Sequence, residues 1–184
     1  MRPLYDYLTE KKGNFIETVQ AVENICKYVG ENLTIEIKLL LAKETVKHNL
    51  AVVKYLTKQG MVSKCKFSLN LLIISKTVVK NLNMFCDDYS ILMNESCSLL
   101  EYCFENNIEI ITSLIPICFL PYKYKEVLLK NYCSQSEEVY YNDKSNQKNN
   151  VIKDMYSSSE ECNKCVYCEI CPKFPKKYLE YISH

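Results

Sequence analysis

Four cysteines recur at two-residue spacing near the end of the 184-residue chain, at Cys162, Cys165, Cys168 and Cys171. Cysteines that only pack in a core have no reason to recur with this period, so the spacing is typical of metal ligands. A C-x-x-C turn directs two thiols to one side, where a cation holds them as thiolates. Zinc accepts four thiolates, whereas iron–sulfur clusters use compact runs that close on Cys-Pro, as Cys171-Pro172 does here. The run predicts a [4Fe–4S] cluster, with structural zinc and a disulfide or packing role as alternatives.

Composition restricts the class of protein to which this run belongs. Hydrophobic residues make up 48% of the chain, yet no run of about 18 apolar residues offers a membrane span. The N-terminal stretch Met1 to Tyr7 lacks the apolar run of a secretory signal, so we expect a soluble, cytoplasmic protein whose 11 cysteines are reduced. A net charge of +1 gives no electrostatic footprint for nucleic acid, and the three glycines form no phosphate-binding loop. We therefore expect neither a nucleic-acid partner nor a membrane partner.

The elements that must position the cysteines are predicted from changes in the period of the apolar residues. A period of three to four predicts a helix, and a period of two or a short apolar run predicts a strand. The predicted elements, in chain order, are a helix at 14–29, a strand at 33–41, a helix at 47–59, a strand at 64–74, a helix at 88–106 and a strand at 108–111. Gly30 and Gly60 are expected to end the first two helices, and Asp87 or Asp88 to cap the third.

Helices that alternate with strands across short connections indicate parallel β/α units. Closed barrels of such units need about eight strands, so we expect residues 1–121 to be a partial β/α barrel that is incomplete as a fold or pairs with another chain. The segment from Tyr122 to Tyr156 has little periodicity and is interpreted as a loop. With the cysteine run and a short helix around residues 176–182, it forms an irregular second unit, 122–184.

Several motifs taken together carry a resemblance to a known family. They are Tyr5 to Phe15, Glu44 to Asn49, Ile115-Pro116-Ile117-Cys118-Phe119-Leu120, and Cys162-x2-Cys165-x5-Cys171-Pro172 with Tyr178. In this order they resemble the C-terminal half of a radical SAM enzyme with an auxiliary cluster segment of the twitch or SPASM kind, over nearly all of the chain. The resemblance implies a partial TIM-like barrel, and an auxiliary [4Fe–4S] cluster held by Cys118, Cys162, Cys165 and Cys171, with Cys168 as the alternative ligand.

The activity that this resemblance implies needs a second polypeptide. No three cysteines here have the C-x3-C-x2-C spacing that holds the SAM-binding cluster in the family, and Lys173 stands where the family often has glycine. We therefore expect a chain that modifies a peptide or small molecule, and binds SAM, only with a partner that supplies the N-terminal half. A standalone iron–sulfur or zinc module in electron transfer or scaffolding is the alternative, and a split protein and a truncated remnant both remain open.

The other reactive residues have simpler interpretations. We expect a packing role for the scattered cysteines, which are Cys26, Cys65, Cys86, Cys97, Cys103 and Cys133. His48 begins a helix and His184 is terminal, so neither is expected to be catalytic. Glu36 and Lys38 lie on a predicted strand, where a solvated face is expected and substrate contact at the mouth of a barrel is the alternative. The sequence assigns no catalytic or SAM-binding residue.

Overall fold

The computed structural model describes residues 5–6, 10–28, 34–71, 88–113, 115–135, 156–157, 160–171 and 173–176. Predictions for Gly30, Asp87, Cys86, His184, the loop at 136–155 and the terminal helix beyond Lys176 lie outside these residues. The elements, in chain order, are α2 (Asn14–Tyr28), β1 (Ile35–Leu41), α3 (Val46–Lys58), η1 (Val62–Lys64), β2 (Cys65–Leu71), α6 (Tyr89–Glu105), β3 (Ile110–Ser113), η2 (Ile117–Phe119), η3 (Tyr122–Tyr124), α7 (Lys125–Gln135), β4 (Tyr156–Ser157), α9 (Glu160–Asn163) and β5 (Phe174–Pro175).

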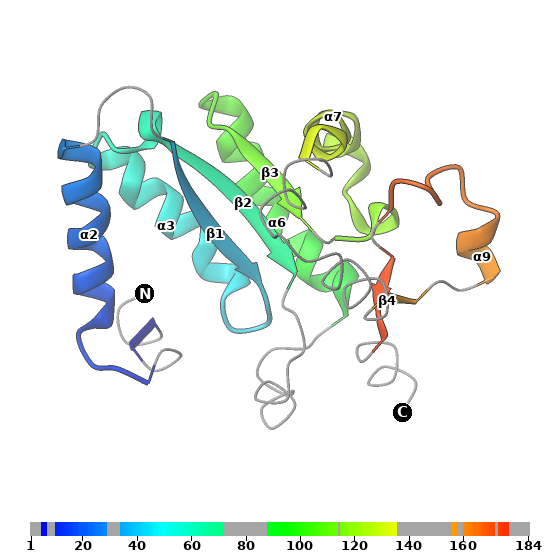
Figure 1. Ribbon diagram of the computed structural model, residues 1–184, viewed down its shortest axis with the longest axis horizontal. Helices are drawn as coiled ribbons and strands as arrows, with labels where there is room; N and C mark the ends of the chain where they lie inside the picture. Colours follow the sequence, from blue (N-terminus) through cyan, green and yellow to red (C-terminus); the bar gives the residue numbers. More distant parts are fainter. Residues whose placement is uncertain are drawn as a thin grey trace, which may run out of the picture.

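Three parallel strands form the main sheet, in the order β1-β2-β3 (Figure 1). The register places Leu39 of β1 beside Leu69 of β2, and Leu69 beside Thr112 of β3. Because β2 is central, β1 and β3 are the two edges within the described residues. The sequence-based prediction of a mixed α/β protein with three parallel strands is confirmed.

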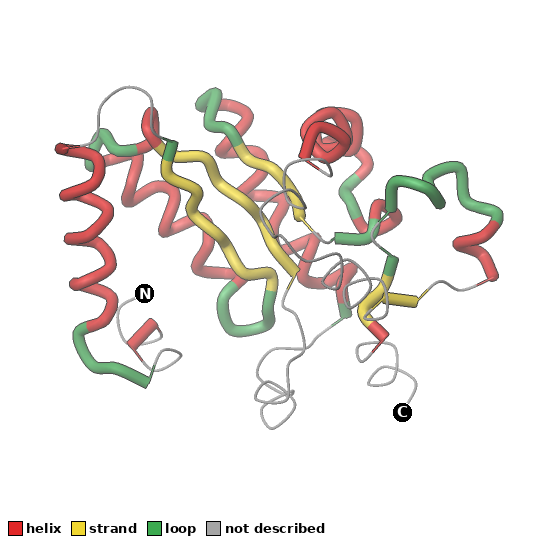
Figure 2. Tube along the Cα trace, viewed as in Figure 1, coloured by secondary structure: helices red, strands yellow, loops and turns green. Residues whose placement is uncertain are grey.

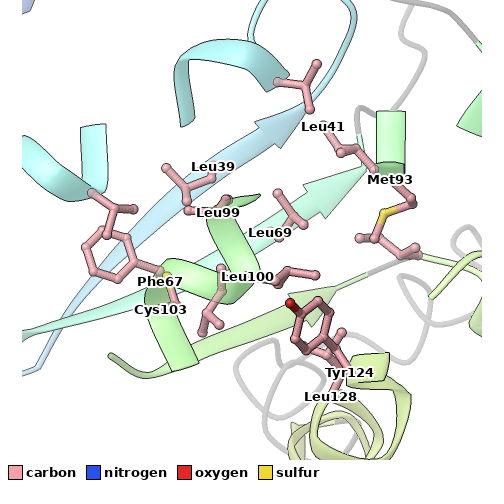
Figure 3. Close-up of a cluster of buried hydrophobic side chains, with 14 of the residues drawn as sticks. Leu39, Leu41, Phe67, Leu69, Met93, Leu99, Leu100, Cys103, Tyr124 and Leu128 are labelled. Carbon is pink, nitrogen blue, oxygen red and sulfur yellow. The ribbon is translucent and has the colours of Figure 1, made fainter. Parts of the chain in front are cut away.

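Helices α3 and α6 cover one face of this sheet (Figure 2). Alternation along β2 directs Phe67 and Leu69 into the core, where both are fully buried, while Lys66 lies on the opposite face and forms an ion pair with Glu109. The predicted core face of α6 is buried as a whole, and it comprises Leu92, Met93, Ser96, Leu99, Leu100 and Cys103 (Figure 3). In the described part of the chain, no helix is both long and apolar enough to cross a membrane.

Helix α6 begins and ends with recognisable capping interactions. The Asp88 carboxylate accepts a hydrogen bond from the Ser90 backbone N–H at 2.7 Å, which confirms Asp88 as the N-cap. At the other end Asn107 adopts a left-handed φ of 53°, and the Ile108 N–H donates to the Cys103 carbonyl at 2.8 Å. This Schellman turn uses Ile108 as its apolar contact, so β3 begins two residues later than predicted, at Ile110.

Helix α7 lies in the segment that the sequence analysis interpreted as a loop, so that interpretation is wrong for Lys125–Gln135. The helix packs on β3 through the fully buried Leu128. The ring of Tyr124, one turn earlier, stacks on Phe104 of α6 with 5.2 Å between centroids. Val127 is 45% exposed, so the apolar residues of α7 do not follow its buried face, and periodicity gives no sign of the helix.

We expect the substitution Gly60→Ala to destabilise the fold by about 1–2 kcal/mol, because a residue with a Cβ is strained in the left-handed region. Gly60 has φ 70° and ends α3 in a Schellman turn, in which the Met61 N–H donates to the Leu56 carbonyl at 3.0 Å. No atom lies within 4 Å of an added Cβ, so the cost is conformational and not steric. Urea unfolding followed by circular dichroism measures it. Lys58→Ala, an exposed change in the same helix, is the control, and equal losses in both variants would contradict the prediction.

Candidate metal centre

Cys118 lies in a short turn just beyond the carboxyl end of β3. The turn is η2, in which the Phe119 N–H donates to the Pro116 carbonyl at 3.0 Å. Ile115 and Ile117 are buried on either side of Pro116, and the next residue, Cys118, is exposed. Buried isoleucines therefore fix the turn on the core and leave the thiol-bearing residue at its surface.

The cysteine run folds into a series of tight turns at its C-x-x-C steps. The Cys165 N–H donates to the Cys162 carbonyl at 3.2 Å, and the Cys168 N–H donates to the Cys165 carbonyl at 3.0 Å. The Tyr167 N–H points at the Cys165 sulfur, with 3.5 Å between N and Sγ. All four thiol-bearing residues are half-buried and free of disulfides. Repeated turns with an N–H directed at sulfur are the local structure that a thiolate ligand requires.

One hydrogen bond joins the turn at Cys118 to the cysteine run, and two contacts between neighbouring residues accompany it, although the two segments are far apart in the sequence. The Ile117 N–H donates to the Cys171 Sγ at 3.5 Å. The rings of Phe119 and Phe174 meet edge to face with 5.4 Å between centroids. Lys125 of α7 places its Nζ 5.2 Å from the centre of the Tyr167 ring. The tail is therefore packed against the carboxyl end of the sheet on both sides of Cys118.

The pKa of the Cys118 thiol is raised by its surroundings, which include other thiols. Partial burial is the largest cause that raises the pKa of the Cys118 thiol, and the neighbouring Cys171 thiol is the second. A backbone hydrogen bond lowers this pKa, while the thiols of Cys162 and Cys165 raise it further. Like-charge interactions of this kind require proximity, so these thiols lie within electrostatic range of Cys118.

Cys168 is tied to Lys173 through its backbone. The Lys173 Nζ donates a short hydrogen bond to the Cys168 carbonyl oxygen. Lys173 itself has φ 68°, a left-handed conformation in which glycine costs least. Cys168 is half-buried. The ligand set of the run differs according to whether this thiol or that of Cys118 is the fourth ligand.

The donor chemistry of Cys118, Cys162, Cys165 and Cys171 fits a thiolate-bound cation or cluster, since soft sulfur ligands are what zinc and iron–sulfur clusters take. Their geometry does not yet form a coordination shell. Among the described residues, no three Cys, His, Asp or Glu side chains are placed so that they could hold one metal ion. Metal–sulfur bonds are about 2.3 Å long, so closing the site requires the sulfurs to move toward a common centre.

The remaining candidates lie elsewhere in the fold. Cys65 and Cys103 are buried, and burial raises the pKa of Cys103 to about 12, as expected of thiols that pack in a core. Cys26 and Cys97 are half-buried. His48 is half-buried in the first turn of α3, and Glu36 and Lys38 are exposed on β1, as expected of a solvated face. The side chain of Cys133 lies outside the described part of the structure.

Sequence analysis missed the residues that hold the cysteine run in place. Tyr167 and Phe174 both pack against the hydrophobic core, and Lys125 belongs to the unpredicted helix α7. An aromatic residue between two cysteines, followed by a second aromatic just after the run, was the available signal, because a solvated ligand loop has no need of either.

Comparison of the chain with protein-family models, with curated proteins and with solved structures finds no significant match. The class of the protein is therefore described by its fold and its tail alone. It is an α/β protein with a three-stranded parallel sheet, and a cysteine-rich tail packs at the carboxyl end of that sheet.

Proposed function

We propose that this chain is the C-terminal portion of a radical SAM protein with an auxiliary [4Fe–4S] cluster held by Cys118, Cys162, Cys165 and Cys171. In this proposal the three strands are part of a TIM-like barrel, and the protein modifies a peptide or small molecule. SAM is bound and cleaved only with a polypeptide that supplies the N-terminal half. The observation that carries the proposal is the hydrogen bond from the Ile117 N–H to the Cys171 sulfur, at 3.5 Å.

This contact supports the proposal because it joins the two motifs from which the ligand set is drawn. One motif follows the last strand of a parallel sheet, at the end where sites gather in β/α folds. The other is the cysteine run. Closing the loop between Cys118 and Cys162 costs only a few kcal/mol, since the entropic penalty grows with the logarithm of loop length. The free energy of metal–thiolate bonds exceeds this penalty. The chain thus has a structural reason to bring Cys118 to the run.

The residues of the chain have separate roles at the proposed cluster. The bound cluster would supply a centre for electron transfer or for a substrate ligand beside the barrel. Backbone N–H groups of Ile117 and Tyr167 donate to the sulfurs of Cys171 and Cys165, which stabilises negative charge on these thiolates. The rings of Phe119 and Phe174 pack edge to face and add an apolar contact between the turn and the tail.

The edge strand β1 supports the proposal of a partner polypeptide. β1 is an edge strand within the described residues, yet Leu39 and Leu41 at its carboxyl end are buried and Ile35 and Ile37 pack against the core. Parallel strands normally lie inside a larger sheet that is covered on both faces. A strand added along β1 would satisfy its unpaired backbone groups and extend the sheet toward a barrel.

A standalone zinc or iron–sulfur module, used in electron transfer or scaffolding, is the second candidate. The tight turn from Cys162 to Cys165 favours it, because structural zinc sites use the same C-x-x-C turn. Zinc would also accept the four thiolates without any contribution from SAM or from a barrel.

Anaerobic reconstitution with ferrous iron and sulfide tests the cluster. We expect about four iron and four sulfide atoms per chain, with the broad visible absorption of a cysteine-bound [4Fe–4S] cluster that bleaches on reduction. Protein that stays colourless while it binds one zinc ion per chain would replace the cluster by the structural-zinc candidate. Co-purification with a polypeptide that contains a C-x3-C-x2-C segment, and formation of 5′-deoxyadenosine only by that pair, would separate the radical SAM function from the standalone module.

A further inference from the structure

The main sheet has one long edge that is unpaired within the described residues. β1 pairs with β2 on one side and with no other described strand, so it is the outer strand of the sheet (Figure 1). Helix α2 makes no more than marginal contact with it. The opposite edge differs, because β3 has only four residues and α7 packs against it. A long strand with unpaired backbone groups is a template for another strand, so β1 is the edge that is open to a partner.

The hydrogen bonds of the sheet determine which residues of β1 present their backbone groups at this edge. The Phe67 N–H donates to the Glu109 carbonyl at 3.0 Å, so the backbone groups of Phe67 face β3. Those of the adjacent residue, Lys66, therefore face β1. In a parallel ladder the residue paired with Lys66 faces away from β2, and the register pairs it with Glu36. The backbone N–H and C=O groups of Glu36, and by alternation those of Lys38, point outward.

The side chains along this edge follow a self-complementary order. Glu36 and Lys38 are exposed on the sheet face that the helices leave uncovered. Ile35 and Ile37 point to the helix side, where they are half-buried against the core. Consider an antiparallel second copy of β1, related by a two-fold axis at Ile37. Glu36 of each chain then lies opposite Lys38 of the other, and Ile35 lies opposite Leu39.

The charges distinguish this register from its neighbours. An axis at Glu36 places two carboxylates opposite each other, and an axis at Lys38 places two ammonium groups opposite each other. Like charges directly opposite are destabilising, whereas opposite charges stabilise a strand pair. With the axis at Ile37, both charged residues face outward, so each opposite-charge pair also exchanges both of its backbone hydrogen bonds. A lysine on an edge strand normally discourages pairing, but here each Lys38 meets a Glu36.

We propose that the chain associates with a second copy of itself through β1, as a two-fold dimer in which the two strands pair antiparallel about Ile37. The three-stranded sheets of the two copies then form one six-stranded sheet. Ile35 and Ile37 of each copy continue the apolar layer across the interface. Because the same surface is used on both chains, each β1 edge is consumed and association stops at the dimer.

This inference goes beyond the proposed function and does not depend on the cluster. A partner polypeptide that adds a strand along β1 would compete for the same edge. The homodimer is therefore the form of the chain that lacks such a partner, and its presence or absence leaves the result of iron reconstitution unchanged.

Sedimentation equilibrium of the full chain in reducing buffer tests the dimer. We expect the mass to rise with concentration from 21.5 kDa toward twice that value. Glu36→Lys and Lys38→Glu should each raise the dissociation constant at least about tenfold, because two like-charge pairs replace two opposite-charge pairs. Lys58→Glu, which makes the same charge change on an exposed position of α3, is the control and should leave the dissociation constant unchanged.

Mixing the two charge variants separates the effect of charge from any effect on folding. In an equimolar mixture of Glu36→Lys and Lys38→Glu, each lysine of one chain lies opposite a glutamate of the other. The mixture should therefore dimerise about as tightly as the unsubstituted chain, and so should the double variant that carries both changes. A folding defect in either variant cannot produce this recovery.

A cysteine at the two-fold axis tests the register. Residues paired without hydrogen bonds across antiparallel strands have Cα atoms about 4.5 Å apart, within the range of a disulfide. Mild oxidation of Ile37→Cys should therefore link residue 37 of one copy to residue 37 of the other, as mapped by mass spectrometry of the peptides. Ile35→Cys, which lies opposite Leu39 and not opposite itself, is the control and should give no such link.

Three results would overturn the inference. The first is an unsubstituted chain that stays monomeric at every concentration at which it is soluble. The second is a dimer that both charge reversals leave intact. The third is a mixture of the two charge variants, each with the circular dichroism of the unsubstituted chain, that stays monomeric.

Discussion

Cys118→Ser is expected to reduce the iron bound after reconstitution from about four atoms per chain to less than one, while Cys168→Ser keeps nearly all of it. Serine is a hard, weakly acidic donor that replaces a cluster thiolate poorly. The thiols of Cys171, Cys162 and Cys165 all raise the pKa of the Cys118 thiol, and the turn that carries Cys118 donates the hydrogen bond to Cys171. In the proposed ligand set Cys118 binds the cluster and Cys168 does not, and this pair of variants tests that assignment.

The comparison is well matched, because both substitutions replace one sulfur atom by oxygen at residues that are not buried. Circular dichroism and urea unfolding of both variants should agree with the unsubstituted chain before reconstitution. Iron and sulfide are then assayed together with the visible spectrum. Cys171→Ser should behave as Cys118→Ser does, and Cys97→Ser as Cys168→Ser does. Loss of the cluster in Cys168→Ser with retention in Cys118→Ser would show a self-contained run and remove the link between sheet and tail.

Phe67→Ala is expected to lower the free energy of unfolding by about 3–5 kcal/mol, the usual cost of a large cavity in a core. Phe67 is fully buried in the middle of the central strand, with Ile37 and Ile110 beside it on β1 and β3. It belongs to the cluster of buried side chains that includes Leu99 and Cys103 of α6 (Figure 3). Truncation of its ring removes its packing contacts within this cluster.

The adjacent residue provides the control for this prediction. Lys66 lies on the other face of β2 and forms an ion pair with Glu109, with 3.3 Å between Nζ and Oε1. Since both side chains are partly exposed, Lys66→Ala should cost less than about 1 kcal/mol. The free energies come from urea unfolding monitored by circular dichroism. A loss in Phe67→Ala no larger than that in Lys66→Ala would mean that the core does not lie between this sheet face and the helices.

Local apolar patterns in the sequence were sufficient to predict the elements that bury one side. The helices α3 and α6 and the strands β1 and β2 show regular apolar periods in the sequence, because each buries one face against a neighbouring layer. Helix α2 shows the same period, although none of its residues is buried. The cap at Asp88 and the left-handed turn at Gly60 are equally local, since they depend on one side chain and on one missing Cβ. The alternation of helices and strands also led to the parallel sheet, through the geometry of β/α crossovers.

Only the tertiary structure decided which distant residues meet. Helix α7 is set by docking Leu128 on β3 and not by its own weak pattern, so packing overrides the local signal. The sequence named the cysteines of the run, but the contact of Ile117 with Cys171 depends on where the sheet ends and how the tail folds back onto it. Spacing along the chain reports on neighbours within a turn, whereas contacts between elements are fixed by the packing of the whole core.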